Sequence, residues 1–304
     1  MSDVAAPARA LSQASISARR RKRMRRWALH AFLIGVCLVW LLPLAWAVYT
    51  SLRPYADTNR LGYVSIGGTY NFDNYINSWT KGEIAKYFVN TAIILVPAVV
   101  VVLLLASMMA FAVSRYSWRF NLALLMLFTA ANLLPAQVII TPLFRMFLVL
   151  PLPSLVSDNG VFYDQYVGIM AIHVAFQLGF CTFVLSNYMK TLPKDLNEAA
   201  VVDGASVWRT FWSVILPLTR PALAALATLQ VTWIYNDFFW ALILMFTGNK
   251  RPITSALNQL KGQFFTDNNL VAAGAILVAL PTLVVFLVLQ KQFVRGLTLG
   301  STKG

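Results

Sequence analysis

Six long apolar stretches constrain what this chain can fold into more than any other feature. They lie at roughly 27–52, 88–113, 120–150, 165–189, 215–246 and 270–290. Each reaches the 20 or so residues that an α-helix needs to cross the hydrocarbon core of a bilayer. Only 12% of the 304 residues are charged, about half the share in ordinary soluble domains. The sequence therefore predicts an all-α, polytopic membrane protein with six transmembrane helices.

Two of these stretches are long and contain prolines. Pro135 and Pro142 fall in the third stretch, and Pro217 and Pro221 fall in the fifth. Proline lacks a backbone N–H and clashes with the preceding turn of a helix, although neighbouring groups in a membrane protein can satisfy the carbonyls that it frees. We therefore expect kinks, or extensions into water, in the third and fifth spans.

Basic residues are numerous and unevenly placed. The chain has 25 Lys+Arg against 11 Asp+Glu, a net charge of +14. Between the predicted spans, 17 of the basic residues lie on the side of the two termini and 8 on the other side. This bias predicts that both termini are cytoplasmic. Without residues 1–26 the counts become 9 and 8, so the predicted orientation depends on that segment.

Residues 1–26 are predicted to form a basic, disordered cytoplasmic tail, and residues 27–304 the six-span domain. The run RRRKRMRR at 19–26 directly precedes the first span, where basic residues bind anionic lipid. Nucleic-acid binding is the alternative for such a run. No basic segment with interleaved aromatic residues accompanies it, so we expect membrane lipids and no nucleic acid as partners.

The loop at about 190–217, between the fourth and fifth spans, has the pattern of two short helices. Asp195 and Glu198 have the spacing of a capping box, and Leu196 to Val202 would form about two turns. Gly204 can adopt the positive φ that ends a helix. Ser206 can cap a second helix, whose predicted apolar face consists of Trp208, Phe211, Trp212 and Ile215. On physical grounds alone, a surface hairpin without a partner is the alternative.

These residues resemble the signature loop of the permease subunits of ABC importers, EAA-x3-G-x9-I-x-LP. Here the loop has Glu198-Ala199-Ala200, then Gly204, then Leu216-Pro217, with Val214 in place of the isoleucine. Three further segments are similar to sugar-importer permeases: Asn71-Phe72-Asp73-Asn74-Tyr75, the run from Trp233 to Trp240, and the C-terminal residues 290–304. Residues from about 28 to 304 resemble a maltose-type (type I) permease subunit.

The resemblance implies a division of labour between subunits. In this family the loop forms a coupling helix seated in a cleft of an ATP-binding subunit. Glu198 would supply a charge-assisted contact, and Ala199, Ala200 and Gly204 would give close packing and the turn. Asp203, Leu216 and Pro217 complete the predicted coupling residues. The chain has no G-x-x-x-x-G-K-[ST] phosphate loop, so we expect no catalytic or metal site here and expect the partner ATPase subunits to bind ATP and Mg²⁺.

Further partners also follow from the resemblance. They are an ATP-binding subunit dimer, a second homologous permease, an extracytoplasmic substrate-binding protein and a sugar or related solute. The implied location is the prokaryotic cytoplasmic membrane, and the implied mechanism is alternating access. The residues do not indicate which sugar is carried. An ion-gradient-driven secondary transporter is the alternative function, although that class does not explain the signature loop.

Polar and aromatic residues in the fifth span are candidates for a substrate path. Asp237 is the only acidic residue within the six spans, and such a group usually faces a partner or a water-filled cavity. It could line the path with Asn236, or it could make a structural pair near a kink. Trp233, Tyr235 and Trp240 could stack on a sugar, although aromatic residues in a span more often pack in the core or anchor at the interface.

Overall fold

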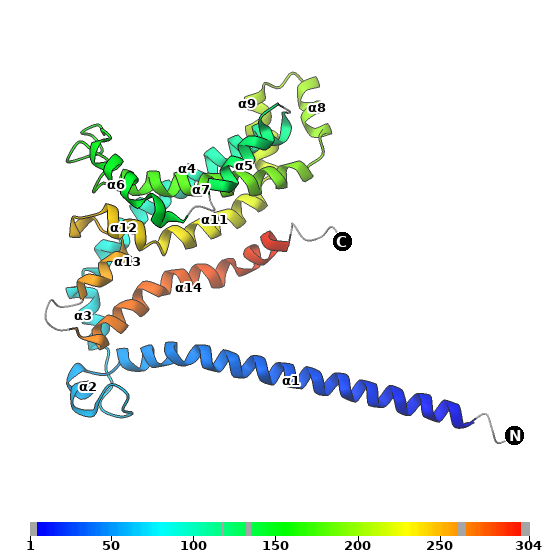
Figure 1. The fold of residues 1–304 in the computed structure, drawn as a ribbon, viewed down its shortest axis with the longest axis vertical. Helices are drawn as coiled ribbons and strands as arrows, with labels where there is room; N and C mark the ends of the chain where they lie inside the picture. Colours follow the sequence, from blue (N-terminus) through cyan, green and yellow to red (C-terminus); the bar gives the residue numbers. More distant parts are fainter. Residues whose placement is uncertain (1–4, 117, 132–134, 261–265, 299–304) are drawn as a thin grey trace.

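The computed structural model describes residues 5–116, 118–131, 135–260 and 266–298, and the regular elements among these residues are all helices, without any strand. The all-α prediction is confirmed. Four long helices dominate Figure 1: α1 (Ala5–Ser51), α4 (Ile84–Arg115), α7 (Tyr166–Thr191) and α14 (Asn268–Thr298). Each contains a stretch long and apolar enough to cross a membrane. Helix α1 continues back to Ala5, so residues 5–26 are helical where a disordered tail was expected; alanine and arginine both favour helix.

A fifth crossing is bent. The segments Val207–Leu218 and Arg220–Tyr235 meet at an angle of 73°. The third predicted span consists of shorter helices, α5 (Asn121–Ala131), η1 (Ala136–Ile139) and α6 (Ile140–Val149), with Pro135 as the residue before η1. The expected kinks in the third and fifth spans are therefore present. The described residues support four spanning helices, or five with the bent pair, where the sequence predicted six.

The core lies along the seam between α4 and α7, which pack against each other over most of their length. Ala106 and Ala110 of α4 are fully buried, as are Cys181, Leu185 and Met189 of α7. These residues form one hydrophobic cluster. Small side chains let two membrane helices approach closely. Helix α11 (Arg220–Tyr235) packs against α4, α7 and α14. It therefore joins α14 to the α4–α7 seam.

Short elements connect these helices on the side that the charge bias predicts to be outer. They are α2 (Tyr55–Leu61), α3 (Asp73–Lys81), α12 (Phe239–Leu244), η3 (Gly248–Lys250), α13 (Ile253–Ala256) and η4 (Leu257–Leu260). The loop with α8 (Asp195–Val202) and α9 (Val207–Thr210) lies at the opposite end of the molecule (Figure 1). The loop is thus separated from the outer elements by the full length of α7.

A substitution in the seam tests its packing. Ala106→Leu should lower the free energy of unfolding by about 1–3 kcal/mol, because extra methyl groups do not fit a filled core. The control is Ala112→Leu on the same helix, where the side chain is exposed. Thermal unfolding of the purified chain in detergent measures both. Equal stability of the two variants would contradict the proposed close contact of α4 and α7.

Candidate functional site

The first helix of the loop, α8, begins differently from the prediction. Lys194 is the N-cap, no side chain caps the helix, and the Lys194 carbonyl accepts hydrogen bonds from the backbone N–H groups of Asn197 and Glu198. Asp195 is the first helical residue, so the predicted Asp195–Glu198 capping box does not form. Both carboxylates still lie in the first turn, where the helix dipole favours negative charge.

The end of α8 is a tight turn at Gly204, as predicted. Gly204 has φ +72°. The N–H of Ala205 donates to the Ala200 carbonyl (2.9 Å), and the N–H of Gly204 donates to Val201 (3.0 Å), the bonding pattern of a Schellman motif. No atom lies within 4 Å of a Cβ added to Gly204. The glycine is therefore needed for its backbone conformation and not for space.

Most side chains of α8 face away from the protein. Ala200 is 8% exposed and packs inward, where α8 contacts α9 and the segment that follows it. Glu198, Ala199, Asp203 and Gly204 are exposed. Val201 and Val202 are also exposed, at 62% and 86%. Glu198 makes no ion pair within the described part of the chain. The loop thus presents exposed carboxylates, with Glu198 directly beside the small side chain of Ala199, and none of its acidic residues makes an ion pair within the described part of the chain.

The second helix of the loop contains a wider turn. Ser206 caps α9 by accepting a hydrogen bond from the Arg209 N–H (3.2 Å), as predicted. Residues Phe211–Ile215 (η2) are π-helical, followed by α10 (Leu216–Leu218). Pro217 has no N–H to donate to the turn before it, and π-helical turns are frequent at functional sites.

The apolar face of this helix is narrower than predicted. Phe211 and Ile215 are buried, whereas Trp208 and Trp212 are 59% and 41% exposed. The two tryptophan rings pack edge to face, with centroids 5.7 Å apart. Phe211 contacts Phe111 near the C-terminal end of α4, with centroids 5.4 Å apart. Two of the four residues of the predicted apolar face are therefore buried in the core, and the other two are exposed.

A sharp bend joins the loop to α11. Thr219 is fully buried at the bend, and its hydroxyl donates to the Ile215 carbonyl (2.7 Å). Leu216 and Pro217 lie just before the bend and are partly buried. Phe211 and Ile215 belong to the same cluster as the α4–α7 seam. The loop is therefore packed against α4 and α7 and continuous with α11. The role of Thr219 was not foreseen, although Pro217 and Pro221 signalled an interruption.

Asp237 lies at a second break, between α11 and α12. Its carboxylate accepts hydrogen bonds from the backbone N–H groups of Trp240 and Ala241, both at 3.3 Å. His173 Nε2 of α7 is 3.6 Å from the same carboxylate. The Thr254 hydroxyl donates to the Asp237 carbonyl. Asp237 thus satisfies the free N–H groups at the start of α12 and lies next to a buried histidine.

The other candidates for the path fall into two groups. Asn236 is exposed, and Trp233 is 44% exposed and packs against Phe180. Tyr235 and Trp240 are both 7% exposed and belong to the core. The Tyr235 hydroxyl donates to the Val278 carbonyl of α14 (2.7 Å). Asn236 and Trp233 are therefore accessible, whereas Tyr235 and Trp240 are packed in the core.

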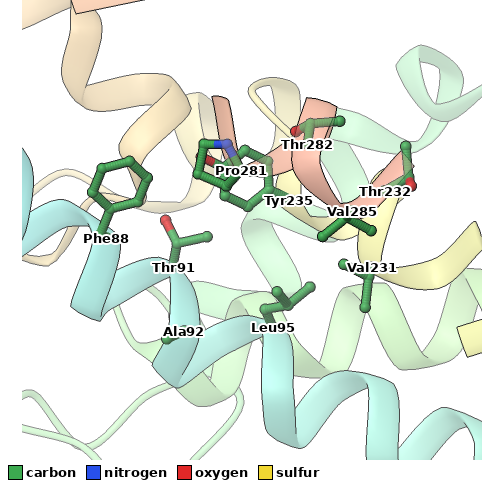
Figure 2. A pocket seen from close by; sticks show the side chains of 10 residues that line it. All are labelled: Phe88, Thr91, Ala92, Leu95, Val231, Thr232, Tyr235, Pro281, Thr282 and Val285. Carbon is green, nitrogen blue, oxygen red and sulfur yellow. The ribbon is translucent and has the colours of Figure 1, made fainter. Parts of the chain in front are cut away.

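A cavity of about 220 Å³ lies over α11, between α4 and α14 (Figure 2). Its lining is mostly apolar, and the hydroxyl groups of Thr91, Thr232 and Tyr235 already donate to backbone carbonyls. The lining residues are Phe88, Thr91, Ala92, Leu95, Val231, Thr232, Tyr235, Pro281, Thr282 and Val285. They come from three distant parts of the chain, so no local sequence pattern could have predicted the cavity.

Removal of the Asp237 carboxylate tests its capping role. Asp237→Ala should lower the free energy of unfolding by about 1 kcal/mol, the usual cost of a lost helix cap. Asp158→Ala is the control, because the Asp158 side chain is 78% exposed in its ion pair with Lys250 and such pairs contribute little. Thermal unfolding followed by tryptophan fluorescence measures both. A loss no greater than that of the control would contradict the capping role.

Comparison with known proteins identifies the family. Residues 102–298 match the family described as binding-protein-dependent transport system inner membrane component. A probable ABC transporter permease protein of Pyrococcus horikoshii is 31% identical over 271 residues, which cover 88% of this chain and 94% of that protein. A diacetylchitobiose uptake system permease protein of Streptomyces coelicolor is 28% identical over 274 residues, covering 90% and 87%.

Solved structures agree with this assignment at the level of the fold. A bacterial ABC transporter involved in the import of the acidic polysaccharide alginate contains a chain that matches with a TM-score of 0.71 and 22% identity, over 87% of this chain and 95% of that chain. The family match covers well over half of the sequence, including the loop and the bent fifth span. The chain therefore belongs to the family of binding-protein-dependent transport system inner membrane components, the membrane-spanning permeases of ABC importers.

Proposed function

We propose that this permease carries a sugar, or a related polyol or oligosaccharide, and that its α8 loop couples it to a separate ATPase subunit. The exposed face of α8 is the observation that carries the coupling. It places the Glu198 carboxylate, with no ion partner among the described residues, beside the small side chains of Ala199 and Gly204. A free carboxylate on a small-residue surface suits a charge-assisted contact with a closely packed protein partner.

The packing behind α8 suits the transmission of movement. Ala200 packs inward, and Phe211 and Ile215 join the loop to the α4–α7 core. The bend at Thr219 joins the same loop to α11. We infer that a displacement of the docked loop tilts α4, α7 and α11 together. ATP and Mg²⁺, bound by the ATPase dimer, would bias the two access states only through their different affinities for them.

The carbohydrate substrate class is supported by the names of relatives. They include permeases for α-glucosides in Rhizobium meliloti and for melibiose, raffinose and stachyose in Bacillus subtilis. An osmoprotective-compound permease of Synechocystis is 30% identical, which keeps related polyols within the proposal. Asn236 and Trp233 are exposed beside the break of span five and are our candidates for contact with the substrate. Asp237 stabilises the break through its hydrogen bonds with the first N–H groups of α12.

Two further partners are included in the proposal. The alginate importer was solved with a periplasmic protein bound to an alginate pentasaccharide, which supports an extracytoplasmic binding protein here. The most apolar 18-residue window of α1 has no buried residue within the described part of the chain and needs lipid or a second permease to cover it. The basic residues at 19–26, which precede the apolar part of α1, support cytoplasmic termini in a multi-pass inner membrane protein. Family membership gives the ion-gradient alternative no support.

Loss of the Glu198 carboxylate tests the coupling. In the reconstituted complex, Glu198→Ala should lower ATP-driven uptake by about 10- to 100-fold, the equivalent of one hydrogen bond to a charged group, without changing expression or thermal stability. Asp195→Ala, one turn earlier on the same helix, should retain near wild-type uptake. Wild-type transport by Glu198→Ala would overturn the coupling role. Uptake that resists vanadate and needs only an ion gradient would overturn the ABC mechanism.

The substrate contacts are tested by a comparison of KM and Vmax. Asn236→Ala or Trp233→Ala should raise the KM for sugar uptake by about 3- to 10-fold, because each change removes one contact with the substrate. Tyr235→Phe is the buried control and should leave KM unchanged. An unchanged KM in both exposed-site variants would remove these residues from the substrate path. Binding measurements on the partner substrate-binding protein would identify the sugar.

A further inference from the structure

The end of α1 is held by an unusual number of side-chain hydrogen bonds. The last carbonyl groups of a helix have no partners within it. Here Asn74 Nδ2 donates to the carbonyls of Ser51 (2.9 Å) and Arg53 (2.8 Å). Asn269 Nδ2 donates to the carbonyls of Thr50 (3.1 Å) and Arg53 (2.8 Å). Two asparagines from distant parts of the chain therefore bind three backbone carbonyls at the end of α1, and they share the carbonyl of Arg53.

The segment Asn71–Tyr75 supplies the rest of this arrangement. The backbone N–H of Asn71 donates to the Leu52 carbonyl (2.9 Å), and the Tyr75 hydroxyl is 2.7 Å from the Ser51 hydroxyl. Asn71 also binds Asp73 at the start of α3. We call Asn71, Asn74, Tyr75 and Asn269 the α1 socket. The Asn-Phe-Asp-Asn-Tyr motif, which resembled the family without an assigned role, provides three of its four residues.

The two asparagines of the socket that bind α1, and two of the three residues whose carbonyls they bind, are buried, whereas Asn71 and Tyr75 are partly buried. Ser51 and Asn269 have no exposed surface, and Arg53 and Asn74 are 1% and 6% exposed. The Arg53 guanidinium lies over the Tyr49 ring, 5.3 Å from its centroid, and donates to the Ser65 carbonyl (2.9 Å). These contacts also help to bury the end of α1 at residues 50–53, which we call the joint. A buried carbonyl that loses its donor has no water to replace it, so the hydrogen bonds from the two asparagines stabilise this arrangement of the joint.

Beyond the socket, α1 is poorly supported. Its only extensive packing within the chain is against α14, and the two helices diverge away from the outer end (Figure 1). Trp40 and Val39 are 76% and 71% exposed. The helix has 47 residues, or about 70 Å of length. A rotation of about 10° at the joint would move its far end by about 12 Å over that length.

We propose that Asn74 and Asn269 are positioning residues that fix the direction in which α1 leaves the permease core. A fixed direction presents the unburied apolar surface of α1 to the second permease at assembly. The identity of that partner rests on the proposed function. The direction of α1 does not, because it depends only on contacts within this chain.

Spin labels on one native and one introduced cysteine can measure the direction of α1. Cys37 is exposed on α1, and Cys181 is buried. With Cys181→Ser in place, nitroxide labels at Cys37 and at Leu283→Cys, an exposed position on α14, report the distance between the helices by pulsed electron paramagnetic resonance. The full chain in lipid nanodiscs, alone and with its partner subunits, is the sample. A narrow distance distribution is expected for the wild-type socket.

The test variants remove the donors and keep their shape. Asn74→Asp with Asn269→Asp should raise the population of displaced α1 by about tenfold or more, because the loss of both donors leaves the Ser51 and Arg53 carbonyls without their side-chain hydrogen bonds. The distance distribution should broaden, and recovery of the second permease on co-purification should fall by a similar factor. The milder Tyr75→Phe should broaden it less. Asn77→Ala, on the same helix α3 with no hydrogen bond to the described part of α1, should match the wild type.

The outcomes separate the two proposals. A broad wild-type distribution, or equal widths for the wild type, the double variant and Tyr75→Phe, would overturn the positioning role even if the complex assembles. Broadening in the isolated chain supports that role. If the wild-type chain recovers no second permease, the proposed function fails while the distances still decide the role of the socket.

Discussion

The bilayer demands that every backbone polar group find a partner inside the protein, and the breaks in the fifth span meet this demand with side chains. At the first break the Thr219 hydroxyl adds to the backbone N–H of the same residue, and both donate to the Ile215 carbonyl. At the second, the Asp237 carboxylate accepts two N–H groups of α12. The chain bends by 73° at the first break, and the segments that follow both breaks still pack in the core. The coupling loop and the candidate substrate path both depend on such breaks.

The closely packed seam of α4 and α7 lies between the loop with α8 and α9 at one end and α12 at the other. Helices α4 and α7 share a closely packed seam, and a close-packed interior transmits displacement instead of absorbing it. The loop joins this seam through Phe211 and Ile215, while α12 joins it through Trp240 and Leu244. A push at one end can therefore reach the other end through side chains that are already in contact.

The sequence was sufficient for features with a local cause. Positive φ at Gly204, the Ser206 cap and the interrupted third and fifth spans each follow from one residue type at one position. The split of the apolar face at Trp208 and Trp212, and the burial of Tyr235 and Trp240, depend on which helices lie opposite. Asn269 gave no local signal either, because its partners are more than 200 positions earlier.

That separation along the chain has a consequence for biosynthesis. Asn269 is 219 residues from Thr50, whose carbonyl it binds. During translation α1 enters the membrane long before Asn269 has been made, so it must remain there without its final anchor. Its most apolar 18-residue window, in which no residue is buried, suits a helix that lipid alone can stabilise. The first helix to be synthesised is thus among the last to be fixed in place.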